Sequence, residues 1–297
     1  MEPTTPTTEP DPWATMANLT TMPRTSNTFT GTVLRREQVT PDLVRIVLGG
    51  EGLTGWTWDG HTDSYFVFWF PPVGAPYSAP FSVEAVQAEQ PQELWPSHRH
   101  YTVRAWDDAA GELSVDFVVH GDEGVAGPWA RDAQVGDQVV LGLPGGGYSP
   151  DAAADWHLLV GDESAFPAIA SAAEAVPAGA TVVAVLVCDG PGRELELSTP
   201  GDLTVHWLHR DHEPSDATLL VDAVRALDFP TGRVHGFVHG EAGEVREVRR
   251  HLLGERGVAK ADLSISGYWR RTMTDEAWRR VKREWNAAVE SDVPAAT

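Results

Sequence analysis

The sequence predicts two domains, an N-terminal antiparallel β-barrel followed by an α/β domain with a parallel sheet. The first observation is length, because 297 residues are enough for about two domains. Second, short β-like runs separated by Gly, Pro and Asp fill the chain from Phe29 to about Tyr148. Third, strands and helices alternate from about Trp156, as in a parallel sheet covered on both faces. We therefore expect a barrel domain over residues 28–150 and an α/β domain over residues 151–290.

The barrel strands are recognised by β-branched and aromatic runs between turn residues. We expect them at Thr32–Leu34, Leu43–Leu48, Tyr65–Phe70, Tyr101–Trp106, Glu112–Val119 and Gln138–Leu143. Apolar and polar residues alternate along Leu113–Phe117, which indicates one buried and one solvent-facing side. This alternation favours an antiparallel barrel.

The second half has strands that are apolar on both faces. We expect them at His157–Val160, Thr181–Cys188, Val205–Leu208, Val234–Val238 and Leu263–Ser266. A helix should follow the first strand to about Val176, and another should bury Val245, Val248, Leu252 and Leu253 and end at Gly254 as its C-cap. Thr274 should cap a last helix, with two acidic residues in its first turn.

Charge and composition exclude several classes of function. The chain has 43 Asp+Glu against 22 Lys+Arg, a net charge of −21, which argues against nucleic acid and anionic membranes. No apolar run is long enough to span a bilayer, and a single cysteine excludes disulfides and Cys-based metal sites. Residues 1–27 lack the basic start and apolar stretch of a secretory signal. We expect disordered ends at 1–27 and 291–297 and a cytoplasmic monomer.

The first segment whose side chains are suited to binding a cofactor contains Arg99, Tyr101 and Thr102. On a strand Arg99 and Tyr101 share one face and Thr102 points to the other. A guanidinium pairs with a pyrophosphate, a phenol ring stacks on a flavin ring, and a hydroxyl donates to a flavin nitrogen. An ordinary surface strand could carry the same three residues, so the motif alone leaves both interpretations open.

Two further segments have backbone geometry suited to phosphate. Gly124–Ala130 follows a strand and opens a helix near Pro128, so its free N–H groups could bind phosphate without a lysine. Gly161–Ile169 follows the first parallel strand, where open α/β sheets bind nucleotides. Each is also compatible with a plain strand–helix connection. Ser164 lies outside a GxSxG elbow, which argues against a serine hydrolase.

Together these segments resemble the siderophore-interacting proteins, flavin-dependent ferric-siderophore reductases with a ferredoxin-reductase-like fold. The resemblance covers residues 29–286 and rests on Arg99–Thr102, Val115–Gly121, Gly124–Ala130, Gly161–Ile169, His239–Ala242 and Gly267–Arg270, in that order. It implies bound FAD, NADPH or NADH as electron donor, and a ferric siderophore as substrate. Hydride would pass to the flavin, which would give single electrons to chelated Fe(III).

The resemblance also implies a set of cofactor-binding residues. They are Arg99, His100, Tyr101, Thr102, Asp116, Phe117, Val118, His120, Gly124, Val125, Ala126, Trp129, Asp162, Glu163, Ser164, Tyr268, Trp269 and Arg270. The first twelve would hold the flavin, the next three would border the nicotinamide, and the last three would close over the flavin. For Tyr268 and Trp269 simple core packing is the alternative. No protein residue is expected to act as acid or base, and no resident metal is expected.

One position departs from the family pattern. Many members carry a lysine in the strand that here reads Tyr65–Phe70, and Val67 stands in its place, leaving Arg270 as the substrate-side cation. A missing cation in a chain of net charge −21 should weaken attraction for a trianionic catecholate complex. We therefore expect a preference for a neutral or less anionic ferric chelate, or for another acceptor.

Other chemistry-bearing residues have simpler explanations. His206, His209 and His212 have regular spacing, but i and i+3 on a strand face opposite ways and do not converge on a metal. Arg210 follows a strand of the nucleotide domain, where it could contact the 2′-phosphate of NADPH or simply be a surface arginine. Cys188 in its apolar strand is expected to be inert core.

Two alternatives to ferric-siderophore reduction remain open at this stage. The first is a general NAD(P)H:flavin, quinone or ferric reductase on the same fold. The second is a siderophore- or flavin-binding protein without turnover. All three share the flavin strand, so the sequence does not separate them.

Overall fold

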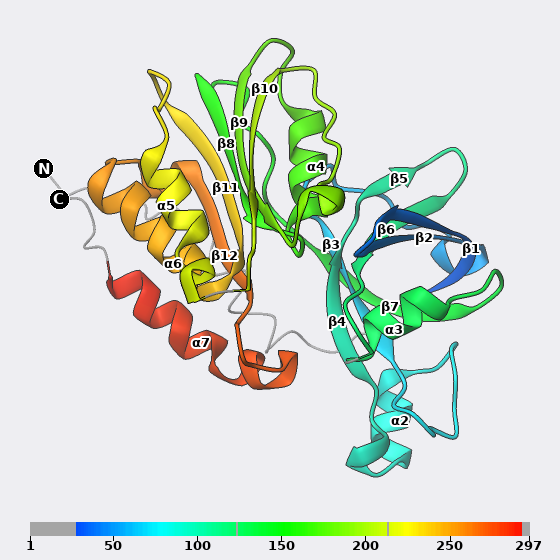
Figure 1. Ribbon diagram of the computed structural model, residues 1–297. Helices are drawn as coiled ribbons and strands as arrows, with labels where there is room; N and C mark the ends of the chain where they lie inside the picture. Colours follow the sequence, from blue (N-terminus) through cyan, green and yellow to red (C-terminus); the bar gives the residue numbers. More distant parts are fainter. Residues whose placement is uncertain (1–27, 123, 213, 293–297) are drawn as a thin grey trace, which may run out of the picture.

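The computed structural model describes residues 28–122, 124–212 and 214–292. Residues 1–27 and 293–297, which include most of the predicted disordered ends, lie outside the described residues. The described chain forms two sheets that lie side by side (Figure 1). The first contains all strands up to residue 145, and the second contains all strands from residue 156.

The first sheet is antiparallel throughout and curls around one core. Its strands are β1 (Phe29–Thr40), β2 (Leu43–Gly49), β3 (Tyr65–Phe70), β4 (Ser97–Thr102), β5 (Ala105–Asp107), β6 (Glu112–Val118) and β7 (Gln138–Gly145). Their order is β4-β3-β7-β1-β2-β6-β5. Beyond edge strand β4, the Arg104 amide donates to the Ser114 carbonyl of β6 at 2.9 Å, so the sheet bends back on itself. The antiparallel barrel predicted from alternation is confirmed.

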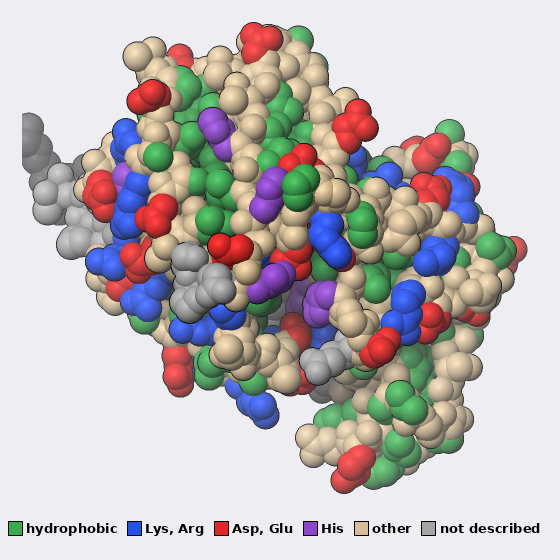
Figure 2. All heavy atoms as spheres, in the orientation of Figure 1, with side chains coloured by type: hydrophobic (Ala, Val, Ile, Leu, Met, Phe, Trp, Pro, Cys, Tyr) green, Lys and Arg blue, Asp and Glu red, His purple; other side chains and the backbone are tan. Residues whose placement is uncertain are grey.

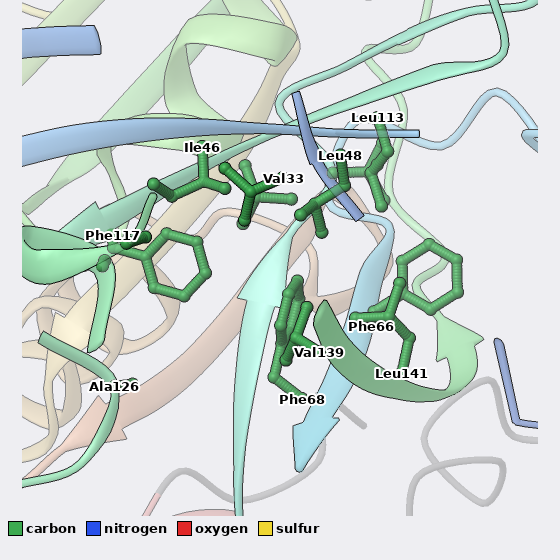
Figure 3. Packing of buried hydrophobic residues seen from close by; sticks show 14 of the residues in the cluster. Val33, Ile46, Leu48, Phe66, Phe68, Leu113, Phe117, Ala126, Val139 and Leu141 are labelled. Atoms are coloured by element: carbon green, nitrogen blue, oxygen red, sulfur yellow. The ribbon is translucent and has the colours of Figure 1, made fainter. Parts of the chain in front are cut away.

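The barrel core comes from alternate residues of these strands. β3 buries Phe66, Phe68 and Phe70 and leaves the residues between them half-buried. Figure 3 shows Phe66 and Phe68 packed among aliphatic side chains of the other strands. Phe117 of β6 meets Phe68 at a ring-centroid distance of 5.4 Å. The period of two thus separates a core face from a face that is free for contacts elsewhere.

The second sheet is parallel throughout, as predicted. Its strands are β8 (Trp156–Asp162), β9 (Thr181–Cys188), β10 (Asp202–His209), β11 (Val234–Glu241) and β12 (Leu263–Trp269), in the order β10-β9-β8-β11-β12. Along β8, Leu159 joins the apolar cluster under one helix, whereas Leu158 and Val160 join the cluster on the opposite face. Both faces are covered, which explains the continuous apolar sequence.

Within the described residues, α-helices accompany both sheets, two within the first domain and four within the second. They are α2 (Val83–Glu89), α3 (Ala126–Asp132), α4 (Phe166–Ala175), α5 (Leu219–Ala226), α6 (Ala242–Arg250) and α7 (Asp275–Ser291). Short 3-10 turns span Glu51–Leu53, Gln92–Leu94, Pro191–Arg193, Pro214–Ala217 and Lys260–Asp262. In Figure 1, α4 lies on the face toward the barrel and α5 and α6 cover the other face. The Thr274 hydroxyl caps α7 by accepting from the Ala277 amide at 3.2 Å, as the sequence predicted.

Three local features differ from the sequence prediction. The strand expected at Tyr101–Trp106 is two strands, because the chain leaves β3 after Thr102 and pairs with β6 from Ala105. Gly254 does not cap α6, since the helix runs into a π-helical turn over His251–Glu255. α7 also continues through Ser291, the first residue of the expected disordered end.

The two domains are joined on both sides of the β4 segment. On one side Arg104 forms a bidentate ion pair with Glu174 of α4, at 2.9 and 2.5 Å. On the other side Arg279 of α7 donates to the carbonyl of His98 at 2.6 Å. These contacts hold the residues of β4 against the second domain.

Candidate functional site

β4 has two faces of different character. In its register with β3, Arg99 is opposite Phe68 and Tyr101 is opposite Phe66, so both lie on the core side. Thr102 is opposite Tyr65 on the other side. The facing predicted from strand geometry is therefore what the pairing shows. The two faces give a flavin different partners, rings and a guanidinium on one side and a hydroxyl on the other.

The ring wall on the core side is built from three strands and α3. The Tyr101 ring is 4.1 Å from Phe117 and 5.6 Å from Phe68. Trp129 of α3 packs 5.5 Å from both Phe117 and Phe70. Phe117 and Trp129 therefore support Tyr101 from behind, and burial raises the pKa of the Tyr101 phenol above its ordinary value.

Arg99 is held by the first turn of α7. Its guanidinium lies 3.2 Å from Asp275 and 2.7 Å from Glu276, and its side chain is only 17% exposed. These carboxylates hold the guanidinium of Arg99 at the junction of the two domains. A pyrophosphate offers the same kind of planar pair of oxygens, so the donor is suited to it.

The start of α3 comes directly beneath this wall. Val125 gives no side-chain cap, and Gly124 has φ 82°, a conformation that favours glycine. At Gly127 an added Cβ would lie 3.2 Å from the Val118 carbonyl, so the turn packs tightly on the end of β6. Arg99, Thr102, the α3 amides and the Tyr101 wall form the donor and ring set that FAD requires. The residues present therefore fit the group.

Three other predicted flavin residues lie differently. Asp116 points away from Phe117 and is fully buried in a bidentate pair with Arg45 of β2, at 2.7 and 2.8 Å. Adjacent strand residues must face opposite ways, so Asp116 stabilises the barrel while Phe117 faces the site. Val118 packs in the cluster shared with the second domain, and His120 is exposed on the following turn.

The other face of β3 and β4 carries His100, which lies opposite Val67. The His100 ring is 5.1 Å from Tyr65 and 5.8 Å from His98. Burial, followed by the charges of Arg279 and nearby cations including Lys282, lowers the pKa of His100 below its ordinary value. Val67 removes one cation from this face, but α7 brings Arg279 and Lys282 toward it.

Asp162 is the last residue of β8 in the second domain. Asp162 is 1% exposed and accepts from the Ser164 amide, the Glu241 amide and the Trp269 indole at 3.0, 2.8 and 2.8 Å. Its oxygens are occupied by the chain itself. Asp162 therefore holds the ends of β8, β11 and β12 together, and Ser164 stays half-exposed beside it.

Glu163 is held by an ion pair with an arginine rather than by backbone and indole donors. Its two oxygens lie 2.6 and 2.9 Å from the guanidinium of Arg210, which also contacts Asp189 at 2.9 Å. Burial raises the pKa of Glu163, and the contact with Arg210 opposes that shift. The arginine considered for a 2′-phosphate is thus neither free nor on the open surface.

The last three residues of the predicted flavin site lie at the end of β12 and directly after it. Tyr268 lies 4.8 Å from the His239 ring, and burial together with Asp63 and Tyr65 raises its pKa well above the ordinary value. Trp269 is fixed by Asp162. Arg270 is half-buried and forms no ion pair within the part of the chain described, so it can accept an anionic ligand.

The remaining chemistry-bearing residues have other partners. His209 contacts Glu194 at 2.8 Å, and the described residues contain no group of three His, Cys, Asp or Glu that could hold a metal ion. Cys188 is buried in the core. None of the helices over residues 28–292 that are described is long and apolar enough to cross a membrane.

Sequence reasoning missed Arg279 and Lys282. Both lie on α7, where the sequence shows only a basic run that is typical of solvated surface. Burial and the charge of Arg279 lower the pKa of Lys282 to about 8. Figure 2 shows histidine, acidic and basic side chains together where the two domains meet. Only the fold brings these side chains to the junction of the two domains.

Comparison with known proteins identifies both halves. Residues 32–148 match the siderophore-interacting FAD-binding domain, and residues 154–272 match the siderophore-interacting protein domain. The chain belongs to the siderophore-interacting protein family. The first half is therefore an FAD-binding domain, and FAD is its cofactor.

Relatives and solved structures agree along most of the chain. The ferric vibriobactin reductase ViuB of Vibrio cholerae is 33% identical over 82% of this chain and 90% of its own. The NADPH-dependent ferric-chelate reductase of Escherichia coli is 32% identical over 80% of this chain and 91% of its own. A siderophore utilization protein from T. fusca superposes with a TM-score of 0.70, at 34% identity over 84% and 95% of the chains. The ferredoxin reductase of carbazole 1,9a-dioxygenase, at 15% identity and TM-score 0.59, has the same fold.

Proposed function

We propose that this protein reduces ferric siderophores, with electrons from NAD(P)H passing through FAD to chelated Fe(III), which is released as Fe(II). One observation carries the proposal within this family. The β4 residues of the FAD-binding domain are held against the second domain, with Arg99 and His98 both in contact with α7. A cofactor held on β4 would therefore lie beside the second domain, close to the cations of α7.

The chain's own residues have binding and orienting roles in this proposal. Arg99 and the first amides of α3 would hold the pyrophosphate of FAD, Tyr101 would stack on its ring, and Thr102 would donate to a ring nitrogen. Asp162 fixes Trp269 and the ends of three strands, and thereby sets the approach of the nucleotide. When bound, FAD supplies the step from two-electron to one-electron chemistry. No side chain needs to move a proton at iron.

The charged residues around the predicted site also influence which substrate charge is preferred. Val67 leaves β3 without a cation, which favours a neutral or weakly anionic chelate. The positive charges of Arg270 and Lys282 partly replace the missing cation. Because the pKa of Lys282 is about 8, its contribution falls as the pH rises through 8. We therefore keep the proposal that an uncharged ferric hydroxamate is preferred over a trianionic catecholate.

We also propose that the protein acts as a cytoplasmic monomer. The cytoplasm holds the nicotinamide nucleotides, and both halves of the site come from one chain. Size-exclusion chromatography with light scattering at micromolar concentration should give a mass near 32.2 kDa. A stable dimer would contradict the monomer.

The function is tested by two half-reactions measured anaerobically by flavin absorbance. We expect NADH or NADPH to bleach the bound flavin, and a ferric siderophore to restore its absorbance while a ferrous chelator traps Fe(II). If quinones restore the absorbance and ferric siderophores do not, the general reductase replaces this proposal. If neither nucleotide bleaches the flavin, the protein binds flavin without NAD(P)H-driven turnover.

A further inference from the structure

Three neighbouring parallel strands end in charged residues that meet at one point. Glu163 directly follows β8, Asp189 directly follows β9 and Arg210 directly follows β10. The three strands are adjacent and parallel, so their carboxyl ends share one edge of the sheet. Arg210 lies between the two carboxylates, at 2.6 Å from Glu163 and 2.9 Å from Asp189, and its side chain is only 10% exposed.

This edge is where a β-α-β unit contacts the adenosine ribose of a dinucleotide. In such units an acidic residue near the end of the second strand accepts a hydrogen bond from the ribose 2′-hydroxyl of NAD, whereas an arginine accommodates the 2′-phosphate of NADP. Here the unit is β8-α4-β9, and the residue after its second strand is Asp189. Asp189 is 38% exposed, and its Oδ2 has no hydrogen-bond partner among the described residues.

We propose that the cluster of Glu163, Asp189 and Arg210 makes this domain select NADH over NADPH. The inference rests on the proposed function, in which a nicotinamide nucleotide binds at this edge. Asp189 accepts the ribose 2′-hydroxyl, and Arg210 positions Asp189 rather than binding a phosphate.

Charge and burial both act against a 2′-phosphate. The cluster holds two carboxylates against one guanidinium, a net charge of −1, and a phosphate monoester adds about −1.5 to −2. Turning Arg210 outward to meet that phosphate would leave Glu163, at 14% exposure, without its partner. Breaking one side of such a buried pair is costly because a charge stays desolvated. The E. coli relative is named as NADPH-dependent, so the proposal gives this chain a different donor from that relative.

The first test measures how fast each nucleotide bleaches the flavin of the FAD-loaded protein. We expect the second-order rate constant to be at least about tenfold higher for NADH than for NADPH. Asp189→Asn keeps the shape and removes one charge, so it should reduce that ratio about tenfold, mainly through faster bleaching by NADPH. Asp202→Asn is the matched control, because Asp202 is exposed at the opposite end of β10. It should leave the ratio unchanged.

The second test does not depend on turnover. Calorimetry of the FAD-loaded protein should show 5′-AMP binding about tenfold more tightly than adenosine 2′,5′-bisphosphate, with a smaller difference in Asp189→Asn. The inference is overturned if the bisphosphate binds as well as AMP, if neither binds, or if Asp202→Asn shifts the ratio as much as Asp189→Asn. Equal bleaching by both nucleotides would overturn it while leaving the proposed function intact. Tighter AMP binding with no bleaching by either nucleotide would support it while removing the proposed function.

Discussion

The two halves of the site use their charged residues in opposite ways. In the barrel half, Arg99 forms ion pairs with carboxylates at the start of α7, one of them 54% exposed, so a stronger anion can compete for it. In the α/β half, Asp162 is 1% exposed and its oxygens are filled by donors of the chain itself. Both residues belong to motifs of the same family, and we propose that only the first contacts a ligand.

This difference shows how to separate a ligand contact from a residue that positions one. A buried carboxylate with all its hydrogen bonds made contributes to stability, and its loss leaves donors unsatisfied. A guanidinium whose carboxylate partners are partly exposed contributes less to stability, because solvent screens its ion pairs. The comparison therefore predicts that variants in the two halves fail in different measurements.

The largest effect is expected at Asp162. Asp162→Ala removes the acceptor of the Glu241 amide, the Trp269 indole and the Ser164 amide. Because unsatisfied buried donors cost about 1–3 kcal/mol each, we expect the free energy of unfolding to fall by about 3 kcal/mol. Urea denaturation of the FAD-loaded protein at a fixed FAD concentration, followed by tryptophan fluorescence, measures it.

Ser164→Ala is the matched control for this prediction. It removes one hydroxyl that donates to Asp162 and leaves the three other donors in place, so it should cost less than about 1 kcal/mol. If Asp162→Ala has normal stability and loses only nucleotide binding, then Asp162 contacts the ligand and the contrast between the two halves is wrong.

A smaller effect, in a different measurement, is expected at Arg99. Arg99→Gln removes the guanidinium that is proposed to pair with the pyrophosphate, and we expect the Kd for FAD to rise about 30-fold, which corresponds to about 2 kcal/mol. Stability of the protein without FAD should change by less than about 1 kcal/mol, because the pairs with Asp275 and Glu276 lie near the surface. Fluorescence quenching of added FAD gives the Kd.

Arg104→Gln is the control on the same segment. Arg104 pairs with Glu174 of α4, on the other side of the domain junction, and so should leave the Kd for FAD within about threefold of the wild-type value. An unchanged Kd in Arg99→Gln would show that the ion pairs with α7 are its whole role.

How well the sequence predicted the fold depended on the strength of the local pattern. The limits of β3 and β9 agree to the residue, because Tyr65–Phe70 and Thr181–Cys188 are apolar runs with abrupt ends. The helices α2 and α5 were missed, since each has fewer than nine residues, too short a stretch to establish a period of 3.6. The break between β4 and β5 depends on a change of partner strand, which no local pattern records.

The site was predictable where it lies on one strand and unpredictable where distant segments meet. Arg99, Tyr101 and Thr102 share β4, so strand geometry gave their faces correctly. The same rule could have shown that Asp116 and Phe117 face opposite ways. The contact between Arg99 and Glu276 spans 177 positions of sequence, and only the folded chain brings α7 to β4.

The smallest effect is expected at Lys282, which lies between the two halves on α7. Its pKa of about 8 means that the ammonium is charged at pH 7 and mostly neutral at pH 9. An anionic chelate is therefore attracted below pH 8 and loses that attraction above it. We expect the KM for a trianionic ferric catecholate to rise about threefold between pH 7 and 9, while the KM for a neutral ferric hydroxamate stays constant. Steady-state rates with a ferrous chelator give both values.

Two substitutions at Lys282 and one at Val67 separate its charge from other effects of pH. Lys282→Arg should keep the low catecholate KM at pH 9, because a guanidinium stays protonated there. Lys282→Gln should have the high KM at both pH values. Val67→Lys adds a cation opposite His100 and should lower the catecholate KM at every pH. A wild-type protein that prefers catecholate to hydroxamate at pH 9 would show that neither Lys282 nor the missing lysine of β3 sets the choice of substrate.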